Sequence, residues 1–463
     1  MIDSTLLFST LFGIACFYLA IGIWNSFQVK TLKSYFLADR NLGVFKLTFT
    51  LVATQLGSGL LLGTSQKAYQ IGLWGVAYTI GMSLGFIILG CGLASRMRSL
   101  NITTTAEIFE THYKSSNLKL FASALSIISL WGILVAQIIA TKMLFLSLGL
   151  DDPYILTAFW GFLICYTMIG GFSSIVIIDA IQVMLIVTIF IYLFFKSLPV
   201  SVNKLANVKL MTKMQNYFFS KKLTYTDFLP TLIMPTLFSL IEQDLAQRFF
   251  AAKTRLTATI SAFLASFMLV GFSFIPLFFG ILAKIKKISI PAGADPLIPV
   301  IAAMTSKTLL VFAICGIIAA ITSTADSLLS AISSNIVQDF GKFLPLDKQK
   351  IFMSRTVSLI TGCCALIASF FIAGDIIFVL ENSYRISVIC LVVPTVIAYF
   401  TQKLHAWSAW TSIACGVVGF IGATIFIKSP ILKDVIPLVC SFIGYFIAHF
   451  TMLHKSKCFE PSN

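Results

Sequence analysis

The sequence Ala-Thr-Gln-Leu-Gly-Ser-Gly at residues 53–59 lies in the middle of an apolar segment that extends from about 44 to 69. That segment is long enough to cross a bilayer as a helix, yet its centre holds polar side chains and two glycines. Backbone groups freed from helical hydrogen bonds persist at membrane depth only where they contact protein or line a cavity. The stretch therefore predicts a broken membrane helix beside a cavity, with close packing through small residues as the alternative.

A second apolar segment, residues 227–252, is interrupted in a similar way. Pro230 and Pro235 precede the polar run Glu242-Gln243-Asp244 within it. The two interrupted segments are five predicted helices apart, and discontinuous helices at matching positions of two halves are typical of transporters with inverted repeats. The halves share no residue-level repeat, so this symmetry is inferred from helix order alone.

The composition of the whole chain agrees with a membrane protein. Of its 463 residues, 58% are hydrophobic and 11% are charged, whereas about a quarter of the residues of a soluble domain are charged. The sequence therefore predicts an all-α polytopic membrane protein in which apolar runs of about 20 residues are transmembrane helices. We expect about 13 of them: 5–26, 44–69, 71–97, 119–149, 153–171, 174–196, 227–252, 255–284, 308–340, 354–372, 374–400, 406–427 and 433–453.

The net charge of +15 indicates topology and contact with anionic lipid, not nucleic-acid binding, because the basic residues lie in short segments between apolar runs. Their distribution favours an N-terminus outside and a C-terminus in the cytoplasm. The basic segment 197–226, which this arrangement places outside, is an exception to the positive-inside rule. Together with the absence of a transit peptide, this topology leads us to expect a multi-pass protein of a cell membrane, the bacterial inner membrane.

Ala320-Ile321-Thr322-Ser323-Thr324-Ala325-Asp326-Ser327 lies inside the ninth predicted helix and is the strongest motif for chemistry. Na⁺ is a hard cation that is bound by several oxygens, and the hydroxyls of Ser323 and Thr324 can supply two of them. Carbonyls of Ala320 and of the broken helix, at Ala53 and Leu56, can supply others. The alternative is that these hydroxyls bond to carbonyls one turn back or join neighbouring helices.

Several segments resemble the sodium/solute symporter family, which includes the proline, pantothenate and sugar symporters. They occur in the order and at the spacing of the family, and they extend over most of the chain. They are Tyr35–Arg40, Ala53–Gly59, Tyr166–Phe172 with Asp179 and Gln182, Gln243 and Gln247-Arg248 with Ala251–Lys253, and Ser323–Ser327 with Asp339.

The resemblance implies a LeuT-type core of two inverted five-helix repeats in a single transporter domain spanning 1–463. Residues 5–26 are then a leading helix, 44–196 and 227–400 the two repeats, and 406–453 two trailing helices. It also implies a Na⁺ site where helices 2 and 9 cross. Carried over by position, its ligands are the carbonyls of Ala53, Leu56 and Ala320 and the hydroxyls of Ser323 and Thr324. Na⁺ is then the coupling ion, and a small-molecule solute and membrane lipid are the partners.

Other polar residues of the predicted helices are candidates for the cation path. Asp179 lies among Ile and Val, where a buried carboxylate is costly and functional by default. An ion pair with a basic loop residue is the alternative. Asp326, within the motif of the ninth helix, joins Asp179 as a candidate for the path or its gate. Arg248 follows Asp244 by four residues, and we interpret that pair as a salt bridge on one helix face.

Six residues are candidates for contact with the solute: Gln55, Ser58, Glu242, Gln243, Asn382 and Arg385. Some relatives carry an acidic residue where this chain has Gln55, which leaves a second cation undetermined. Arg385 can hold a carboxylate through two parallel hydrogen bonds, or it can pair with Glu381. With Lys67 near the outer end of helix 2, Arg385 favours an anionic or zwitterionic solute.

These observations predict Na⁺-coupled symport of a small polar organic solute by alternating access, the solute being an amino acid, carboxylate, vitamin or sugar. A proton-coupled transporter, a channel and a substrate-sensing membrane protein on the same scaffold are the alternatives. An enzyme is not indicated, because hydrolase, metalloprotease and phosphate-loop motifs are missing from the sequence. The ten cysteines and four histidines form no metal-binding pattern.

Overall fold

A computed structural model provides the structure of the protein. It describes residues 4–27, 31–205, 225–291, 293–343, 350–372, 374–401 and 404–458. This part of the chain is helical, apart from turns and an isolated bridge between Leu42 and Ala252. The basic residues expected in the segment 206–224 lie outside the described residues. The prediction of an all-α protein is confirmed.

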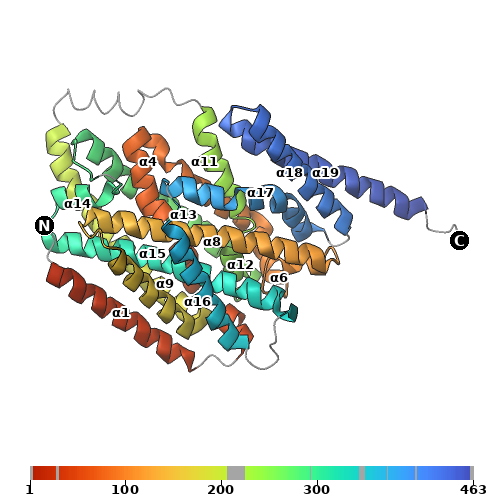
Figure 1. Ribbon diagram of the computed structural model, residues 1–463, viewed down its shortest axis with the longest axis horizontal. Helices are drawn as coiled ribbons and strands as arrows, with labels where there is room; N and C mark the ends of the chain where they lie inside the picture. Colours follow the sequence, from red (N-terminus) through yellow and green to blue (C-terminus); the bar gives the residue numbers. More distant parts are fainter. Residues whose placement is uncertain are drawn as a thin grey trace.

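The helices follow the order expected from the apolar segments (Figure 1). The long helices and their sections are α1 Ser4–Ser26, α3 Val44–Gln55, η2 Gly59–Gly63, α4 Thr64–Ile71, η3 Gly72–Val76, α5 Ala77–Ile88, η4 Leu89–Leu93, α6 Ala94–Ser99, α8 Ser116–Ser147, α9 Pro153–Leu205, α11 Tyr225–Phe238, α12 Gln243–Ala251, α13 Arg255–Ile285, α15 Lys307–Asp339, α16 Lys350–Ser369, α17 Ile376–Phe400, α18 Ala406–Phe426 and α19 Pro430–Cys458. Short helices lie between them: α2 Leu32–Leu37, η1 Ala38–Arg40, α7 Glu107–Thr111, α14 Leu297–Met304 and η5 Gly341–Phe343.

Ten helical stretches of the described chain are long and apolar enough to cross a membrane, fewer than the 13 expected segments. Two of the ten, Gly59–Ser99 and Pro153–Leu198, have 41 and 46 residues, and each contains helix from two predicted segments. The chain turns within them at Gly72 and Gly171, whose φ values are +70° and +65°. A side chain rarely adopts this conformation, so glycine permits both turns. The seventh predicted segment is divided between α11 and the short α12.

Both predicted helix breaks are present. At the first break, α3 ends at Gln55, and helical structure resumes at Gly59 as the π-helical η2. Likewise α11 ends at Phe238 and α12 begins at Gln243, after Glu242 in an extended conformation with φ −63° and ψ 121°. The breaks leave backbone groups at the end of α3 and at the start of α12 without helical partners.

The helix α15 lies at the centre of the bundle and α1 at its edge (Figure 1). In the most apolar window of α15, 83% of the residues are buried, against 17% for α1. On the far side of the bundle from α1, the neighbouring helices α18 and α19 pack against each other and against α17. This arrangement makes α15 the helix best placed to carry a buried polar site.

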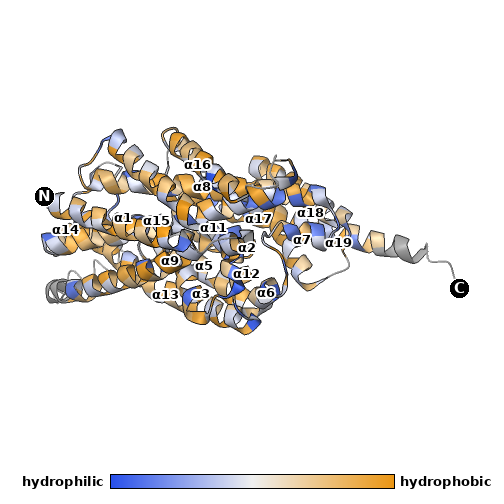
Figure 2. Ribbon diagram, turned by 90° about the horizontal axis from the view of Figure 1, so that it is seen from below, coloured by the Kyte–Doolittle hydropathy of each residue, from blue (hydrophilic) through white to orange (hydrophobic). Residues whose placement is uncertain are grey.

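The outer faces of the peripheral helices are apolar, as a protein surrounded by lipid requires. Hydrophobic residues cover the helices in Figure 2, while hydrophilic ones gather near α6 and α7. Exposed examples are Phe12 and Trp24 on α1 and Phe426 and Phe450 on α18 and α19. In water, faces this large would drive aggregation. The long apolar helices and their exposed apolar faces are therefore those of a multi-pass membrane protein.

Candidate functional site

The first polar cluster forms where α15 crosses α3 at its break. The Ser323 hydroxyl donates to the carbonyls of Ala53, at 3.1 Å, and Ala320, at 2.9 Å. The Thr324 hydroxyl donates to the carbonyls of Thr54, at 3.0 Å, and Ala320, at 3.2 Å. Both side chains are buried. The crossing therefore brings together neutral oxygens from two helices without a charged group among them.

Four of the five residues expected to bind Na⁺ lie in this first cluster. The fifth, Leu56, is the C-cap residue of α3 at the break itself, with φ −73° and ψ 21°. Carbonyl and hydroxyl oxygens are ligands of the kind that hard cations take in proteins. Within the described residues, no group of three or more His, Cys, Asp or Glu is arranged for a metal ion. The donor set of the first cluster thus fits a monovalent hard cation better than it fits zinc or iron.

A second, charged cluster lies one helical turn away. Arg248 of α12 is fully buried, and its Nη2 is 3.1 Å from Asp179 Oδ2 and 2.6 Å from Ser327 Oγ. Its Nε donates to the carbonyl and the hydroxyl of Thr50, at 3.1 and 3.0 Å, and Thr50 donates to Asp179 at 2.5 Å. Four helices, α3, α9, α12 and α15, contribute to this one network, which is therefore a tie between helices far apart in the sequence.

The predicted helix-face pair between Asp244 and Arg248 is wrong. Arg248 Nη1 bonds the backbone carbonyl of Asp244, at 2.9 Å, and the guanidinium extends away to Asp179. The reason is position: Asp244 lies in the first turn of α12, where its carboxylate accepts the N–H of Leu245 at 3.0 Å. Asp179 thus has a partner, and that partner is a buried helix residue, not one in a loop.

Asp326 lies on another face of α15 and bonds to α9. It accepts hydrogen bonds from Thr167, at 2.5 Å, and from Tyr166. A second contact between the same two helices is the hydrogen bond that Gln182 of α9 donates to the Thr322 hydroxyl of α15, at 3.0 Å. Asp326 is therefore held by neutral hydroxyls, and it does not join the network of Asp179.

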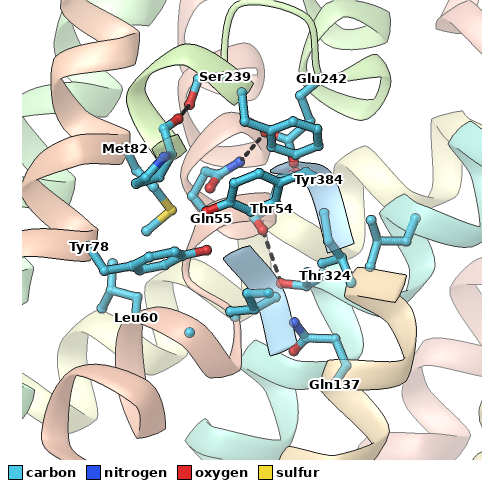
Figure 3. Close-up of a pocket in the computed structure, with 17 residues that line it drawn as sticks. Thr54, Gln55, Leu60, Tyr78, Met82, Gln137, Ser239, Glu242, Thr324 and Tyr384 are labelled. Carbon is cyan, nitrogen blue, oxygen red and sulfur yellow. Dashed lines mark hydrogen bonds between the residues drawn. The ribbon is translucent and has the colours of Figure 1, made fainter. Parts of the chain in front are cut away.

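A small cavity of about 30 Å³ lies beside the first cluster, between the two helix breaks. Gln55 donates to Glu242 at 3.1 Å across it, and Thr324 is one of its walls (Figure 3). Tyr384 stacks on Phe238 with ring centroids 4.3 Å apart. The remaining lining residues come from α3, η2, α5, α8, α11, α15, α17 and the two breaks: Thr54, Gly57, Gly59, Leu60, Tyr78, Met82, Ile133, Gln137, Pro235, Ser239, Leu328 and Leu380. This space holds about two water molecules, so a solute requires the walls to move apart.

Two of the six residues expected to contact solute, Gln55 and Glu242, line this cavity. Gln243 lies away from it, because its amide accepts from Thr105 N–H at 2.6 Å and donates to Thr103 O at 3.2 Å. Ser58 is fully buried next to the cavity, and its N–H donates to Gln137 at 3.1 Å.

The other two expected contacts, Asn382 and Arg385, lie on a different face of α17. Asn382 is exposed, and Arg385 Nε is 3.0 Å from Asp434 Oδ1 of α19. Helical geometry explains the difference, because Leu380 and Tyr384, which do line the cavity, are four residues apart on the opposite face. The expected cation Lys67 is likewise occupied, at 3.2 Å from Asp375.

Several cavity residues were not among the candidates from sequence, and Gln137 is the clearest. A glutamine in the middle of an apolar helix is a signal that sequence alone offers. Tyr78, Phe238 and Tyr384 give no such signal, because aromatic residues occur throughout these helices. Their place in the cavity depends on how the helices pack.

Comparisons with known proteins agree with the motifs. The model described as the sodium:solute symporter family matches residues 35–416. Sodium/glucose cotransporter 4 of Danio rerio is 26% identical over 189 residues, which are 38% of this chain and 28% of that protein. High affinity choline transporter 1 of Homo sapiens is 30% identical over 187 residues, 37% of this chain and 32% of that protein. The matched stretches thus span about a third of the length of these relatives.

Solved structures show the same fold. A Na⁺-coupled sialic acid symporter, in a substrate-bound outward-open state, matches with a TM-score of 0.78 and 21% identity over 97% of both chains. Mhp1, a nucleobase-cation-symport-1 family transporter in a closed conformation with bromovinylhydantoin bound, gives 0.62 and 14% identity over 93% of this chain and 96% of that one. Both neighbours are transporters, not enzymes, and the expected LeuT-type fold is confirmed.

Proposed function

The chain belongs to the sodium:solute symporter family, and from this premise we propose that it moves a small organic solute across a membrane, driven by a Na⁺ gradient. The observation that carries the proposal is the neutral oxygen cluster of Ser323, Thr324, Ala53 and Ala320 at the break of α3. A gradient is a sufficient source of work, since one charge crossing 100 mV releases about 2.3 kcal/mol.

Na⁺ binding needs only a small rearrangement in this cluster. Each hydroxyl hydrogen now points at a carbonyl, and rotation about the C–O bond turns the oxygen lone pairs toward an ion instead. The carbonyls of Ala53 and Ala320 then lose their hydroxyl donors and become free to bind the ion as well. We include the carbonyl of Leu56, the residue at the end of α3, as the fifth ligand.

Coupling between the ion and the solute follows from residues that the ion site and the cavity have in common. Thr324 is a proposed ion ligand and also lines the cavity. Gln55, which follows Thr54 in α3, bonds Glu242 across the same cavity at 3.1 Å. An ion that orders the end of α3 therefore also orders the side chains that meet the solute, so each ligand strengthens binding of the other.

Access to the cavity runs past Phe238 on one side. This ring lines both the central cavity and a smaller one, of about 10 Å³, that includes Thr105 and Ser387. In the topology with the N-terminus outside, Thr105 is on the cytoplasmic side. We infer that the stack of Phe238 on Tyr384 closes the inner exit and separates when the solute leaves.

Alternating access is the movement expected of this fold, with one group of helices rocking against the other. We assign the two groups to the inverted repeats 44–196 and 227–400, and we keep Asp326 as the candidate for the cation path, because Asp179 is already paired with Arg248. The N-terminus lies outside, the C-terminus is cytoplasmic, and the membrane is a bacterial inner membrane. The figure supports part of this topology, since α1 begins and α19 ends at opposite ends of the bundle (Figure 1).

Proton coupling is the second candidate, and one observation favours it. Glu242 is a buried carboxylic acid in the cavity wall, where it can take up a proton from one side and release it to the other. The two coupling ions make different predictions, because Glu242 supplies no ligand to a site built from Ser323 and Thr324.

The test is uptake of a panel of labelled metabolites into proteoliposomes with an inward Na⁺ gradient, against a matched K⁺ control. We expect Na⁺-dependent accumulation that is lost when Ser323 and Thr324 both become Ala. Ser333→Ala is the matched control, because that hydroxyl lies on the same helix but bonds Ser354 of α16. Accumulation driven only by a pH gradient, or full Na⁺ dependence in the double variant, would contradict the proposal.

A further inference from the structure

The charge of the central cavity is one-sided. Glu242 is the carboxylate in its wall, and none of the lining residues in the described chain is Lys, Arg or His. The two cations that the sequence suggested for this region are both paired elsewhere. Lys67 is 3.2 Å from Asp375, and Arg385 is 3.0 Å from Asp434. A solute in the cavity therefore meets a potential negative charge and no positive side chain.

In the part of the chain that the structure describes, Glu242 lacks a basic partner, whereas the buried acid Asp179 of the charged cluster has one. It is 7% exposed, accepts a hydrogen bond from the neutral amide of Gln55 at 3.1 Å, and lies next to the carboxyl group of a second buried acid, Asp244. In the described residues no basic nitrogen lies within ion-pair distance of it, whereas Asp179 has Arg248 at 3.1 Å. Burying a carboxylate without an opposite charge is costly, and a ligand that brings a positive charge removes most of that cost.

Aromatic rings complete the same wall. Tyr78 extends toward the centre of the cavity from one side, and Tyr384, stacked on Phe238, closes another (Figure 3). The face of an aromatic ring attracts a cation, most strongly where water is excluded. A ring beside a carboxylate is an arrangement that favours an amine or ammonium group over a neutral sugar hydroxyl.

The hydroxyl of Tyr384 supplies a second polar contact. The side chain is 1% exposed, and its Oη has no hydrogen-bond partner in the described part of the chain. Buried hydroxyls without partners are uncommon, and each one costs free energy until something bonds it. A polar atom on the solute, near its charged nitrogen, meets this need.

We propose that the transported solute carries a positively charged nitrogen, which binds between the Glu242 carboxylate and the rings of Tyr78 and Tyr384. A neighbouring polar group on the solute bonds Tyr384 Oη. The proposal rests on the symport function proposed above and narrows its substrate class. It reverses the expectation drawn from Arg385 and Lys67, which pointed to a carboxylate as the group that the protein recognises. Solutes whose only charge is negative are disfavoured, because the described residues of the cavity offer them no side chain of opposite charge.

Matched pairs of solutes test the inference on the full chain, purified in detergent with NaCl. Each pair differs only at the nitrogen: choline with 3,3-dimethylbutan-1-ol, ethanolamine with ethylene glycol, and alanine with lactate. The measurement is the shift of the melting temperature with solute concentration. We expect the nitrogen-bearing member of at least one pair to bind at least tenfold more tightly than its partner. Equal or tighter binding of nitrogen-free members would overturn the inference.

Glu242→Gln provides the second arm, because glutamine keeps the shape and can still accept from Gln55. We expect it to weaken binding of the nitrogen-bearing solute at least tenfold, while Ser333→Ala, whose hydroxyl bonds the Ser354 carbonyl outside the cavity, weakens it less than threefold. Unchanged affinity in Glu242→Gln would overturn the inference. The comparison of solute pairs uses the wild-type protein. It therefore still tests the inference if the Glu242→Gln protein does not fold.

The two proposals fail in different ways. If an amine binds with the same affinity in NaCl and in KCl, the proposal of Na⁺ coupling is wrong and the proposed substrate class is unaffected. Na⁺-dependent binding of lactate or ethylene glycol would remove the substrate class and leave the symport function standing.

Discussion

Where α15 crosses α3, two polar clusters lie one helical turn apart and satisfy their polar groups in opposite ways. Ser323 and Thr324 bond only to carbonyls, so all members of their cluster are neutral. Asp179 and Arg248 neutralise each other, and Thr50 and Ser327 bond to the pair, while Asp179 Oδ1 has no hydrogen-bond partner in the described part of the chain. The clusters meet where Thr54 Oγ1 and Ser327 Oγ lie 3.5 Å apart.

The difference between the clusters indicates which one exchanges a ligand. In the charged cluster the guanidinium of Arg248 already neutralises Asp179, and its positive charge repels a second cation. Neutral oxygens attract a cation without binding each other strongly, since a hydroxyl-to-carbonyl bond contributes only about 1 kcal/mol. We therefore interpret the charged cluster as a structural joint and the neutral one as the ion site.

Loss of the ion pair should have the largest effect. Arg248→Ala leaves Asp179 buried without an opposite charge, and breaking a buried pair from one side costs about 3–5 kcal/mol. We expect a large fall in the melting temperature, or loss of folded protein, in detergent-solubilised samples analysed by size exclusion. Na⁺ should not restore it.

A second substitution separates charge from packing at that joint. Asp179→Asn together with Arg248→Ala removes both charges, and we expect it to regain part of the lost stability. The exposed Lys253 is the control, because Lys253→Ala removes a cation near the end of α12 without touching the network. A stable Arg248→Ala protein would mean that the ion pair is not a structural joint.

The neutral cluster should respond to the ion instead. In wild-type protein, Na⁺ at about 100 times its Kd adds about 2.7 kcal/mol of stability. The double variant Ser323→Ala, Thr324→Ala should lose that gain and yet melt close to wild type in KCl, because it gives up only the weak hydrogen bonds of two neutral hydroxyls. The measurement is the melting temperature over a series of NaCl concentrations at constant ionic strength. A Na⁺ shift of wild-type size in this variant would place the ion elsewhere.

Gly57 tests how closely the two helices must approach at the ion site. A Cβ atom there would lie 2.4 Å from Thr324 Oγ1, so Gly57→Ala forces the helices apart at a cost of about 1–3 kcal/mol. We expect a lower melting temperature and weaker Na⁺ stabilisation together. Gly271→Ala is the control, since nothing lies within 4 Å of its Cβ position in α13. Equal melting temperatures for the two variants would show that the crossing is not tightly packed.

Asp295, in the segment between α13 and α14, extends the comparison to an acid with neutral partners only. Burial raises the pKa of Asp295 to about 7, against the opposing hydrogen bonds from Leu297 N–H and the Ser65 hydroxyl. The unfolded pKa is about 3.9. The protonated acid therefore contributes stability that is complete below about pH 4 and is lost as the pH rises through 7.

Between pH 6 and 8 the expected loss is about 1 kcal/mol, the smallest effect in this series. Asp295→Asn cannot titrate, so its melting temperature should vary less over this interval than that of the wild type. The exposed Asp151→Asn should behave like the wild type. Parallel pH profiles for the wild type and Asp295→Asn would show that Asp295 does not cause the pH dependence.

Much of the fold could be predicted from apolar runs, because a bilayer forces each crossing segment to satisfy its backbone internally. The breaks expected in the run 53–59 and within 227–252 are present at 56–58 and 239–242, and they could be predicted because glycine, proline and polar residues stand out against an apolar background. The turns at Gly72 and Gly171 lie close to the boundaries expected between the segments 44–69 and 71–97 and between 153–171 and 174–196.

The site divides along the same line. The sequence by itself determined the residues with unusual chemistry for a membrane helix: Ser323, Thr324, Gln55, Glu242 and Asp179. Their partners were decided only by the tertiary structure. Arg248 bonds Asp179, which lies 69 residues away in the chain, and Arg385 bonds Asp434 of another helix. The physical reason is that the chemistry of a residue is set by its own side chain. Its bonding partner is set by the second helix that packs against that side of the first helix.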